Sequence, residues 1–219
     1  MIKVSMRWGA AVLLAIGAGG GLHGYGQQAS PLVLSKTIIF PDAQGGFNHM
    51  SVDAGRMRLF AAMPTNMTVE VADVKSGKPE RSLNGERPAV VRYAQEFDQL
   101  YVSNVRGVSI YSGKTLDLIS TVDLGGDELQ YDALAGRLYA GCMTAGKTGI
   151  AVIAIPEGKL VGKIALPDKL QGVVVEAGGG RIYANMPTLK QVAVMDGNRL
   201  SLIAAAAGGC GGEYAAWTG

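Results

Sequence analysis

The feature of this sequence that most constrains its fold is an internal repeat. An aliphatic residue followed directly by an aromatic residue recurs at Leu59-Phe60, Leu100-Tyr101, Leu138-Tyr139 and Ile182-Tyr183. Successive pairs are separated by 41, 38 and 44 residues. Periods of this length are typical of solenoids and propellers, in which one small unit stacks on its neighbours to build a continuous core.

Each repeat unit contains four segments with the pattern of a β-strand. The expected first strands are His49–Asp53, Val90–Tyr93, Glu128–Asp132 and Gly172–Glu176. The aliphatic-aromatic pair lies in the second strand, and the third strand has a period of two, as in Met67–Val71 and Gln191–Met195. Fourth strands, such as Leu118–Leu124 and Val161–Leu166, follow a glycine turn. Four antiparallel strands in about 40 residues are typical of a propeller blade.

We therefore predict an all-β fold, a β-propeller of four-stranded antiparallel blades, with the paired residues buried between neighbouring blades. The expected blades span residues 46–85, 86–126, 127–168 and 169–209, within a domain of residues 27–219. A helical repeat is excluded because apolar residues recur every two positions rather than every 3.6, and the glycines would break each helix. A β-sandwich with accidental periodicity stays open, because such sandwiches also contain short alternating strands.

The repeated strand gives the chain a resemblance to a known family. Segments such as Gly136-Arg137-Leu138-Tyr139-Ala140, followed by an alternating strand and a turn of the type Ser112-Gly113-Lys114, resemble the YncE-like, YVTN-repeat family of bacterial propellers. The resemblance covers about residues 32–207, and in it residues 46–53 and 127–132 look like the first and third inner strands. It implies an exported protein with a ring of seven blades, of which about four are present.

The two ends of the repeat array suggest an incomplete ring. A fifth unit begins at residue 210 but stops before a second strand, and Ile38–Asp42 looks like the fourth strand of a preceding blade. We interpret the chain as a truncated member of the family. An open array of four blades is expected to leave one apolar face uncovered at each end.

The first 26 residues have the pattern of a signal peptide. Lys3 and Arg7 precede an uncharged, mostly apolar stretch over residues 8–22, and Gly24-Tyr25-Gly26 offers a cleavage site. This stretch is too short and too rich in glycine for a transmembrane helix, so we expect a periplasmic or secreted protein with no stable membrane span after cleavage. Removing the two basic residues leaves 18 basic and 18 acidic residues. A neutral domain argues against a nucleic-acid partner.

Candidate site residues lie where the inner strands begin, because these positions meet at one rim of the central channel. They are His49 and Glu128, with Asn48, Asp127 and Gln171 directly before inner strands. An imidazole and carboxylates on one rim could hold a cation or act as acid and base. We favour a hydrated channel lining with weak ligand-binding potential, and we assign no catalytic or metal-binding residue.

Several kinds of chemistry are excluded by residue counts and motifs. His23 lies in the signal peptide, so His49 is the one histidine of the mature chain and a multi-histidine metal site is excluded. The sequence also lacks a Cys-x-x-Cys-His haem motif, a Gly-x-Ser-x-Gly elbow and a complete phosphate-binding glycine loop. Cys142 and Cys210 lie nearly two blades apart, so we expect free thiols. We predict no cofactor.

Two functions remain. The first is a non-catalytic exported propeller that presents its rim to a partner protein, a glycan or a small ligand. The alternative is a metal-assisted, lactonase-like hydrolase in which carboxylates at the channel rim hold a divalent cation. We favour the first over an enzyme because few metal-binding side chains fall at the rim positions.

Overall fold

The computed structural model describes residues 34–144, 147–178 and 180–207. The chain divides into two units, Met1–Ser35 and Lys36–Gly219, and the described strands belong to the second. The signal peptide expected over residues 1–26 lies outside the described residues. So does the incomplete fifth repeat from residue 210, including Cys210.

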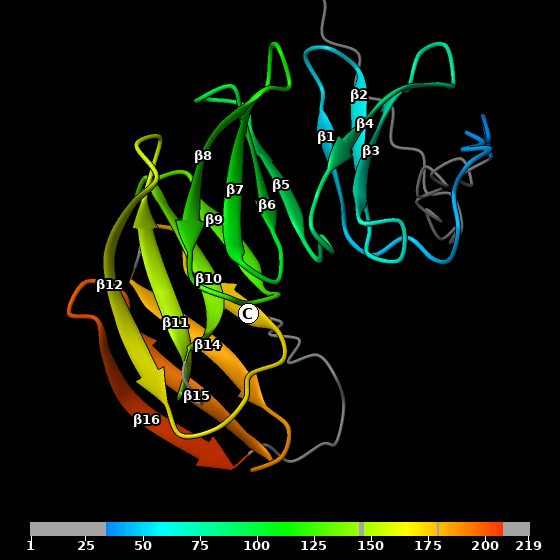
Figure 1. Ribbon diagram of the computed structural model, residues 1–219. Coiled ribbons are helices and arrows are strands. Elements are labelled where there is room, and N and C mark those ends of the chain that lie inside the picture. The colour runs from blue at the N-terminus through cyan, green and yellow to red at the C-terminus, as the bar shows by residue number, and fades with distance from the viewer. Residues whose placement is uncertain (1–33, 145–146, 179, 208–219) are drawn as a thin grey trace, which may run out of the picture. The chain divides into compact units, whose positions relative to one another are not determined.

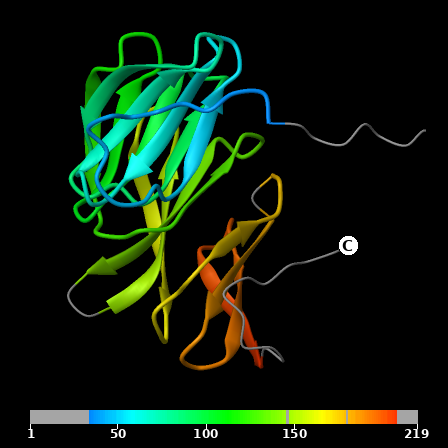
Figure 2. The same ribbon diagram turned by 90° about the vertical axis from the view of Figure 1, so that its right-hand side faces the viewer.

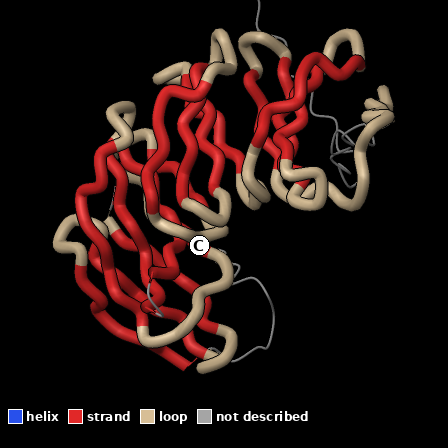
Figure 3. Tube along the Cα trace, viewed as in Figure 1, coloured by secondary structure: helices blue, strands red, loops and turns tan. Residues whose placement is uncertain are grey.

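The described chain folds into four antiparallel sheets of four strands each, in which every strand pairs with the strand that follows it in the sequence (Figures 1 and 3). We number the sheets as blades 1 to 4. Blade 1 contains β1 (Met50–Asp53), β2 (Arg58–Met63), β3 (Thr68–Asp73) and β4 (Lys78–Asn84). Blade 2 contains β5 (Val91–Ala94), β6 (Gln99–Ser103), β7 (Gly107–Ser112) and β8 (Leu118–Asp123). Blade 3 contains β9 (Leu129–Asp132), β10 (Arg137–Thr144), β11 (Lys147–Ala154) and β12 (Lys159–Leu166). Blade 4 contains β13 (Val173–Val175), β14 (Arg181–Met186), β15 (Gln191–Asp196) and β16 (Ser201–Ala207).

The all-β, four-stranded architecture expected from the repeat is confirmed, and each sheet falls within one repeat unit of the sequence. Successive innermost strands are neighbours, since β1 contacts β5, β5 contacts β9 and β9 contacts β13. No helix in the described ranges is long and apolar enough to cross a membrane.

Every blade has a bulge at the same place, between its third and fourth strands. The register shifts fall after Val71, Ile110, Val152 and Val194. Each of these residues is the cross-strand partner of the aromatic residue of its blade. Bulges increase local twist. Each outer strand is therefore twisted at the position next to the aromatic residue of its blade.

The paired residues divide between the two faces of each blade because neighbouring side chains of a strand point to opposite sides. We call the side toward the next blade in the sequence the forward face and the other side the backward face. Phe60 packs forward against Leu100 of blade 2, in one cluster with Tyr93. Tyr101 packs forward against Leu138 in the same way. Each interface therefore joins an aromatic residue of one blade to an aliphatic residue of the next.

Two of the paired residues do not follow the expectation of complete burial. Leu59 and Tyr183 are only half-buried, whereas Leu100, Leu138 and Ile182 are fully buried. Leu59 lies on the backward face of blade 1 and Tyr183 on the forward face of blade 4. No described blade packs against either face, so the position of the blade in the array decides the burial.

Arginines tie neighbouring blades together at the ends of the strands. Arg58 Nη1 of blade 1 donates a hydrogen bond to the carbonyl oxygen of Gly113 in blade 2, at 3.1 Å. Arg137 Nη1 of blade 3 donates to the carbonyl oxygen of Gly197 in blade 4, at 2.7 Å. Both arginines directly precede the paired residues, and both glycines lie in the turn between third and fourth strands. The same interblade contact is thus repeated by the same sequence positions.

A second cluster joins blades 1 and 2 at the rim opposite the starts of the inner strands. Arg56 binds both carboxylate oxygens of Asp98 at 2.7 Å and the buried carboxylate of Asp53 at 2.9 Å. The Tyr93 hydroxyl donates a hydrogen bond to Asp98 at 2.7 Å. Burial, and then the hydrogen bond to Asp98, raise the pKa of Tyr93 to about 12. The tyrosine therefore stays a hydrogen-bond donor throughout the physiological pH range.

The segment before β1 corrects an expectation from the sequence. Ile38–Asp42 was expected as a fourth strand, but it forms no strand and runs across the backward face of blade 1 (Figure 2). The side chain of Asn66 holds it, donating to the carbonyl oxygen of Asp42 at 3.2 Å and accepting from the Gln44 amide at 3.0 Å. A strand needs a hydrogen-bonded partner strand, and no described strand pairs with this segment.

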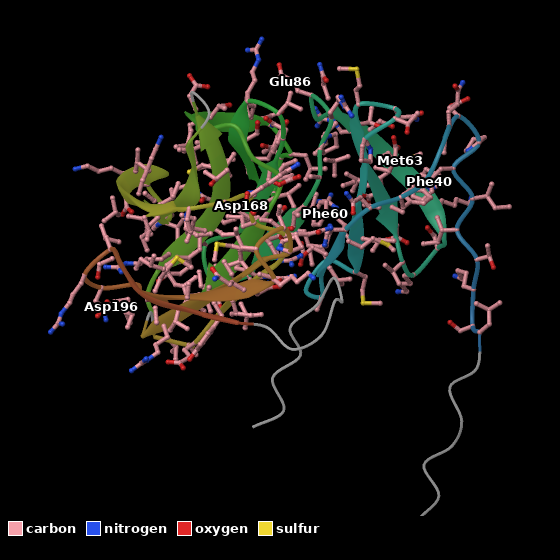
Figure 4. All side chains as sticks on the ribbon, turned by 90° about the horizontal axis from the view of Figure 1, so that it is seen from below. Phe40, Phe60, Met63, Glu86, Asp168 and Asp196 are labelled. Carbon is pink, nitrogen blue, oxygen red and sulfur yellow. The ribbon has the colours of Figure 1, made fainter. Side chains whose placement is uncertain are left out.

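The same segment runs over part of a face that was expected to be open. Phe40 and Phe47 contact each other with ring centroids 5.5 Å apart. Figure 4 labels Phe40 of this segment and Met63 at the end of β2. Met63 and Ala61 belong to the backward face of blade 1 and are buried. The expectation of an uncovered apolar face at the start of the array is therefore wrong for the part of this face at Ala61 and Met63. It holds for Met50 and Val52, which lie across from Ala61 and Leu59 on the same face and are 55% and 53% exposed.

Candidate functional site

The predicted site residues lie at one rim, on the connections that lead into the inner strands. Asn48 and His49 directly precede β1, Asp127 and Glu128 precede β9, and Gln171 lies two residues before β13. The antiparallel order of each blade places all of these strand starts at the same end of the sheets. They differ in what their side chains contact.

Glu128 lies within electrostatic reach of His49 in blade 1 and of its sequence neighbour Asp127. The Glu128 Oε1 atom accepts a hydrogen bond from the Gly172 amide of blade 4 at 3.0 Å. Burial is the largest influence and raises the pKa of Glu128, while the Gly172 amide and the charges of His49 and Arg92 oppose that shift. The His49 Nδ1 atom lies 3.3 Å from the carbonyl oxygen of Ala89.

The other predicted residues contribute through their backbone or face solvent. The Gln171 amide donates to the carbonyl oxygen of Asn185 at 2.8 Å, and the Asn48 amide donates to that of Ala62 at 2.9 Å. Both residues are exposed, as is Asp127. Among the described residues, no three His, Cys, Asp or Glu side chains come together as a set that could hold a metal ion.

Arg92 is a member of this rim cluster that the sequence analysis missed. It lies in β5, directly across from Tyr101. Burial lowers the pKa of its guanidinium, and the charge of Glu128 opposes the shift. The equivalent positions in the other blades are Ser51, Gln130 and Val174. An alignment of the repeats would have shown an arginine at this inner position and indicated a partner carboxylate.

The raised pKa of Glu128 predicts a pH-dependent effect of Glu128→Gln. Because the folded state holds this pKa above its ordinary value of 4.5, stability falls as the pH rises above that value. Glutamine removes the charge that costs stability at pH 7, and its amide oxygen can still accept from Gly172. We expect a higher melting temperature than wild type at pH 7 and no difference at pH 4. Thermal melts at both pH values measure this, and a larger gain at pH 4 would contradict it.

A pocket of about 340 Å³ opens at the same rim, between the connections of blades 1 to 4. Its lining residues are Arg87, Ala89, Asn104, Val105, Gly125, Gly126, Asp127, Gly141, Cys142, Thr148, Lys169 and Leu170. Asp127 is the one predicted site residue among them. Pockets of about 300–1,000 Å³ are typical of small-molecule sites.

The wall of the pocket depends on close approach of two backbones. A Cβ atom added to Gly126 would lie 1.6 Å from the carbonyl oxygen of Gly141, so blade 3 admits only glycine there without a shift. On another side, Glu86 and Arg87 both have positive φ angles, of 50° and 61°. Left-handed backbone at two successive non-glycine residues is strained and is often found at binding sites.

Two further lining residues have well-defined roles. Asn104 is buried, and its side chain accepts hydrogen bonds from the amides of Arg106 and Gly107, at 2.9 and 3.0 Å, which fixes the turn beside the pocket. Cys142 is a buried thiol whose pKa is raised by burial. A raised pKa reduces the thiolate fraction that would make the sulfur a nucleophile. Cys142 is a free thiol, as the sequence predicts, and Cys210 lies outside the described residues.

Comparison with known proteins supports the fold and gives no family. Neither a family model nor a curated protein matches the chain. A solved structure described as Kuenenia stuttgartiensis hydrazine synthase is similar, with a TM-score of 0.53 and 11% identity over 74% of each chain. At this identity the likeness concerns architecture alone. The chain is thus an all-β protein with a propeller-like fold of four-stranded blades.

Proposed function

We propose that the protein is an exported, non-catalytic propeller whose rim pocket binds a small ligand. The pocket at Arg87, Asp127 and Lys169 carries the proposal, because its volume of about 340 Å³ suits a small molecule. The signal-peptide pattern of residues 1–26 and the resemblance to YncE-like propellers support export to the periplasm or beyond the cell.

The lining of the pocket favours a small organic anion. Arg87 and Lys169 bring two positive charges to the pocket and Asp127 brings one negative charge. Val105 and Leu170 add apolar surface. A ligand with one carboxylate and a short apolar body would satisfy both kinds of group.

The contacts of the rim residues support binding over catalysis. The Glu128 carboxylate accepts a hydrogen bond from the Gly172 amide, and His49 faces the carbonyl oxygen of Ala89. These contacts join blades 3 and 4 and blades 1 and 2. The two groups therefore have backbone partners in neighbouring blades that hold the rim together.

Blocking the pocket tests this function. Val105 lines the pocket and is 60% exposed, so Val105→Trp should fill the mouth without disturbing the core. Val161→Trp, on exposed β12, is the matched control. We expect short-chain carboxylic acids to raise the melting temperature of wild type and the control but not of Val105→Trp. Ligand at 100 times its Kd stabilises a protein by about 2.7 kcal/mol, a shift of several degrees.

The corresponding neutral amides separate the two parts of the proposal. If acids and amides stabilise wild type equally, the pocket binds small molecules but has no preference for anions. Binding in this pocket is contradicted if no compound changes the melting temperature of wild type, or if Val105→Trp responds as wild type does.

A further inference from the structure

The forward face of blade 4 has the residues of an interblade surface. Ile182 and Ala184 of β14 are buried against blade 3, so the alternation of the strand places Tyr183 and Asn185 on the forward face. Val174 pairs with Tyr183 across the sheet and is 50% exposed. The described strands that pack against blade 4 belong to blade 3, where β9 contacts β13 and β12 contacts β16.

Asn185 on this face holds a buried donor that lacks an acceptor in the described part of the chain. Its Nδ2 atom is inaccessible to solvent and makes no hydrogen bond there. Ser103 has the equivalent position in blade 2, two residues after the aromatic residue. The Ser103 hydroxyl lies 3.3 Å from the carbonyl oxygen of Asp127, at the entry to the next inner strand, and can donate to it. The equivalent acceptor for Asn185 would be a carbonyl at the entry to a fifth inner strand.

The sequence after β16 supplies such an entry at the right distance. Seven positions separate Asn84 from Val91 and Leu166 from Val173, which are ends of fourth strands and starts of the next inner strands, and six positions separate Asp123 from Leu129. Seven positions after Ala207 is Tyr214. With this spacing the preceding Gly211-Gly212-Glu213 corresponds to Gly126-Asp127-Glu128 before β9, and both segments begin with glycine and end with glutamate. In this alignment Gly212 corresponds to Asp127, and Tyr214 to the buried residues Val91, Leu129 and Val173.

We propose that the forward face of blade 4 is a docking surface for the chain's own residues 212–217. Tyr214 and Ala216 then face Val174 and Tyr183, and Asn185 Nδ2 donates to the carbonyl oxygen of Gly212. Tyr214 is the residue that this docking buries most, because its equivalents in blades 2, 3 and 4 have at most 2% exposure. The proposal is independent of ligand binding at the rim.

A single tryptophan at position 214 tests the docking in the full chain. The chain contains two tryptophans, Trp8 and Trp217, which are replaced by phenylalanine, and Tyr214→Trp adds the probe. We expect blue-shifted emission and protection from acrylamide quenching. Val174→Lys, placed on the docking surface, should shift the emission toward that of free tryptophan and raise the quenching constant several-fold. Val161→Lys on β12 is the control and should change neither.

Each other outcome contradicts the proposal in a recognisable way. Emission like that of free tryptophan in the parent protein would show that residue 214 does not dock. Protection that disappears on dilution would show that a second copy of the chain covers the face. Protection that Val174→Lys leaves unchanged, with far-ultraviolet circular dichroism showing a folded protein, would place the tryptophan on another surface.

Discussion

Leu138→Ala is expected to lower the free energy of unfolding by about 2–5 kcal/mol, the usual cost of a large cavity in a core. Leu138 is fully buried between blades 2 and 3, in one cluster with Tyr101. Leu59→Ala removes the same atoms from the same repeat position in blade 1, where the side chain is only half-buried. We expect it to cost clearly less than Leu138→Ala.

Denaturant unfolding of the two variants and wild type gives both values under one set of conditions. The comparison separates interblade packing from the properties of leucine in a strand, because residue type and repeat position are matched. Equal losses would contradict the assignment of Leu138 to an interface between blades and Leu59 to an end of the array.

Gly126→Ala is expected to destabilise the protein by about 1–3 kcal/mol, the usual cost of overpacking, and to abolish binding in the rim pocket. The added Cβ would lie 1.6 Å from the backbone oxygen of Gly141, and backbone cannot move aside as a flexible side chain can. The connection between β8 and β9 would have to move away from β10 at the pocket wall. Gly46→Ala is the control, since a Cβ there meets no atom within 4 Å.

Melting temperatures with and without a stabilising carboxylic acid measure both effects. A Gly126→Ala protein with wild-type stability and wild-type ligand response would show that the close approach of the two backbones is not needed for the pocket. A loss of stability in Gly46→Ala of similar size would show that the effect comes from replacing a glycine and not from the contact.

The fold could be predicted because the information that determines it recurs in each unit. The pair Leu138-Tyr139 marks the second strand of its blade. Because neighbouring side chains of a strand point to opposite faces, one residue of the pair packs against each neighbouring blade. The covering of blade 1 could not be predicted in this way. Ile38–Asp42 resembles a fourth strand in sequence but forms none, and the position of this segment depends on side-chain contacts such as those of Asn66 with Asp42 and Gln44.

Only part of the rim site could be predicted from the sequence, for a related physical reason. Repeat alignment identified the starts of the inner strands, which led to His49 and Glu128. The pocket instead combines connections from different blades, and much of its wall is backbone, as at Gly126 and Gly141. Glycines are so common at turns that their presence does not indicate a close approach of two backbone segments. Arg92 was missed although its signal, a charge at an inner-strand position, is visible in the sequence.

The most direct test of a ligand-binding rim is to locate the bound ligand by nuclear magnetic resonance. Titration of ¹⁵N-labelled protein with the most stabilising carboxylic acid should shift the amide signals of Gly125, Gly126, Gly141 and Leu170, which line the pocket. Signals of β16, on the outer edge of blade 4, should stay in place. A second pocket lies between β4 and β8, where residues such as Arg81 and Thr121 line it. Shifts confined to blade 4, or to this second pocket, would contradict ligand binding at the rim.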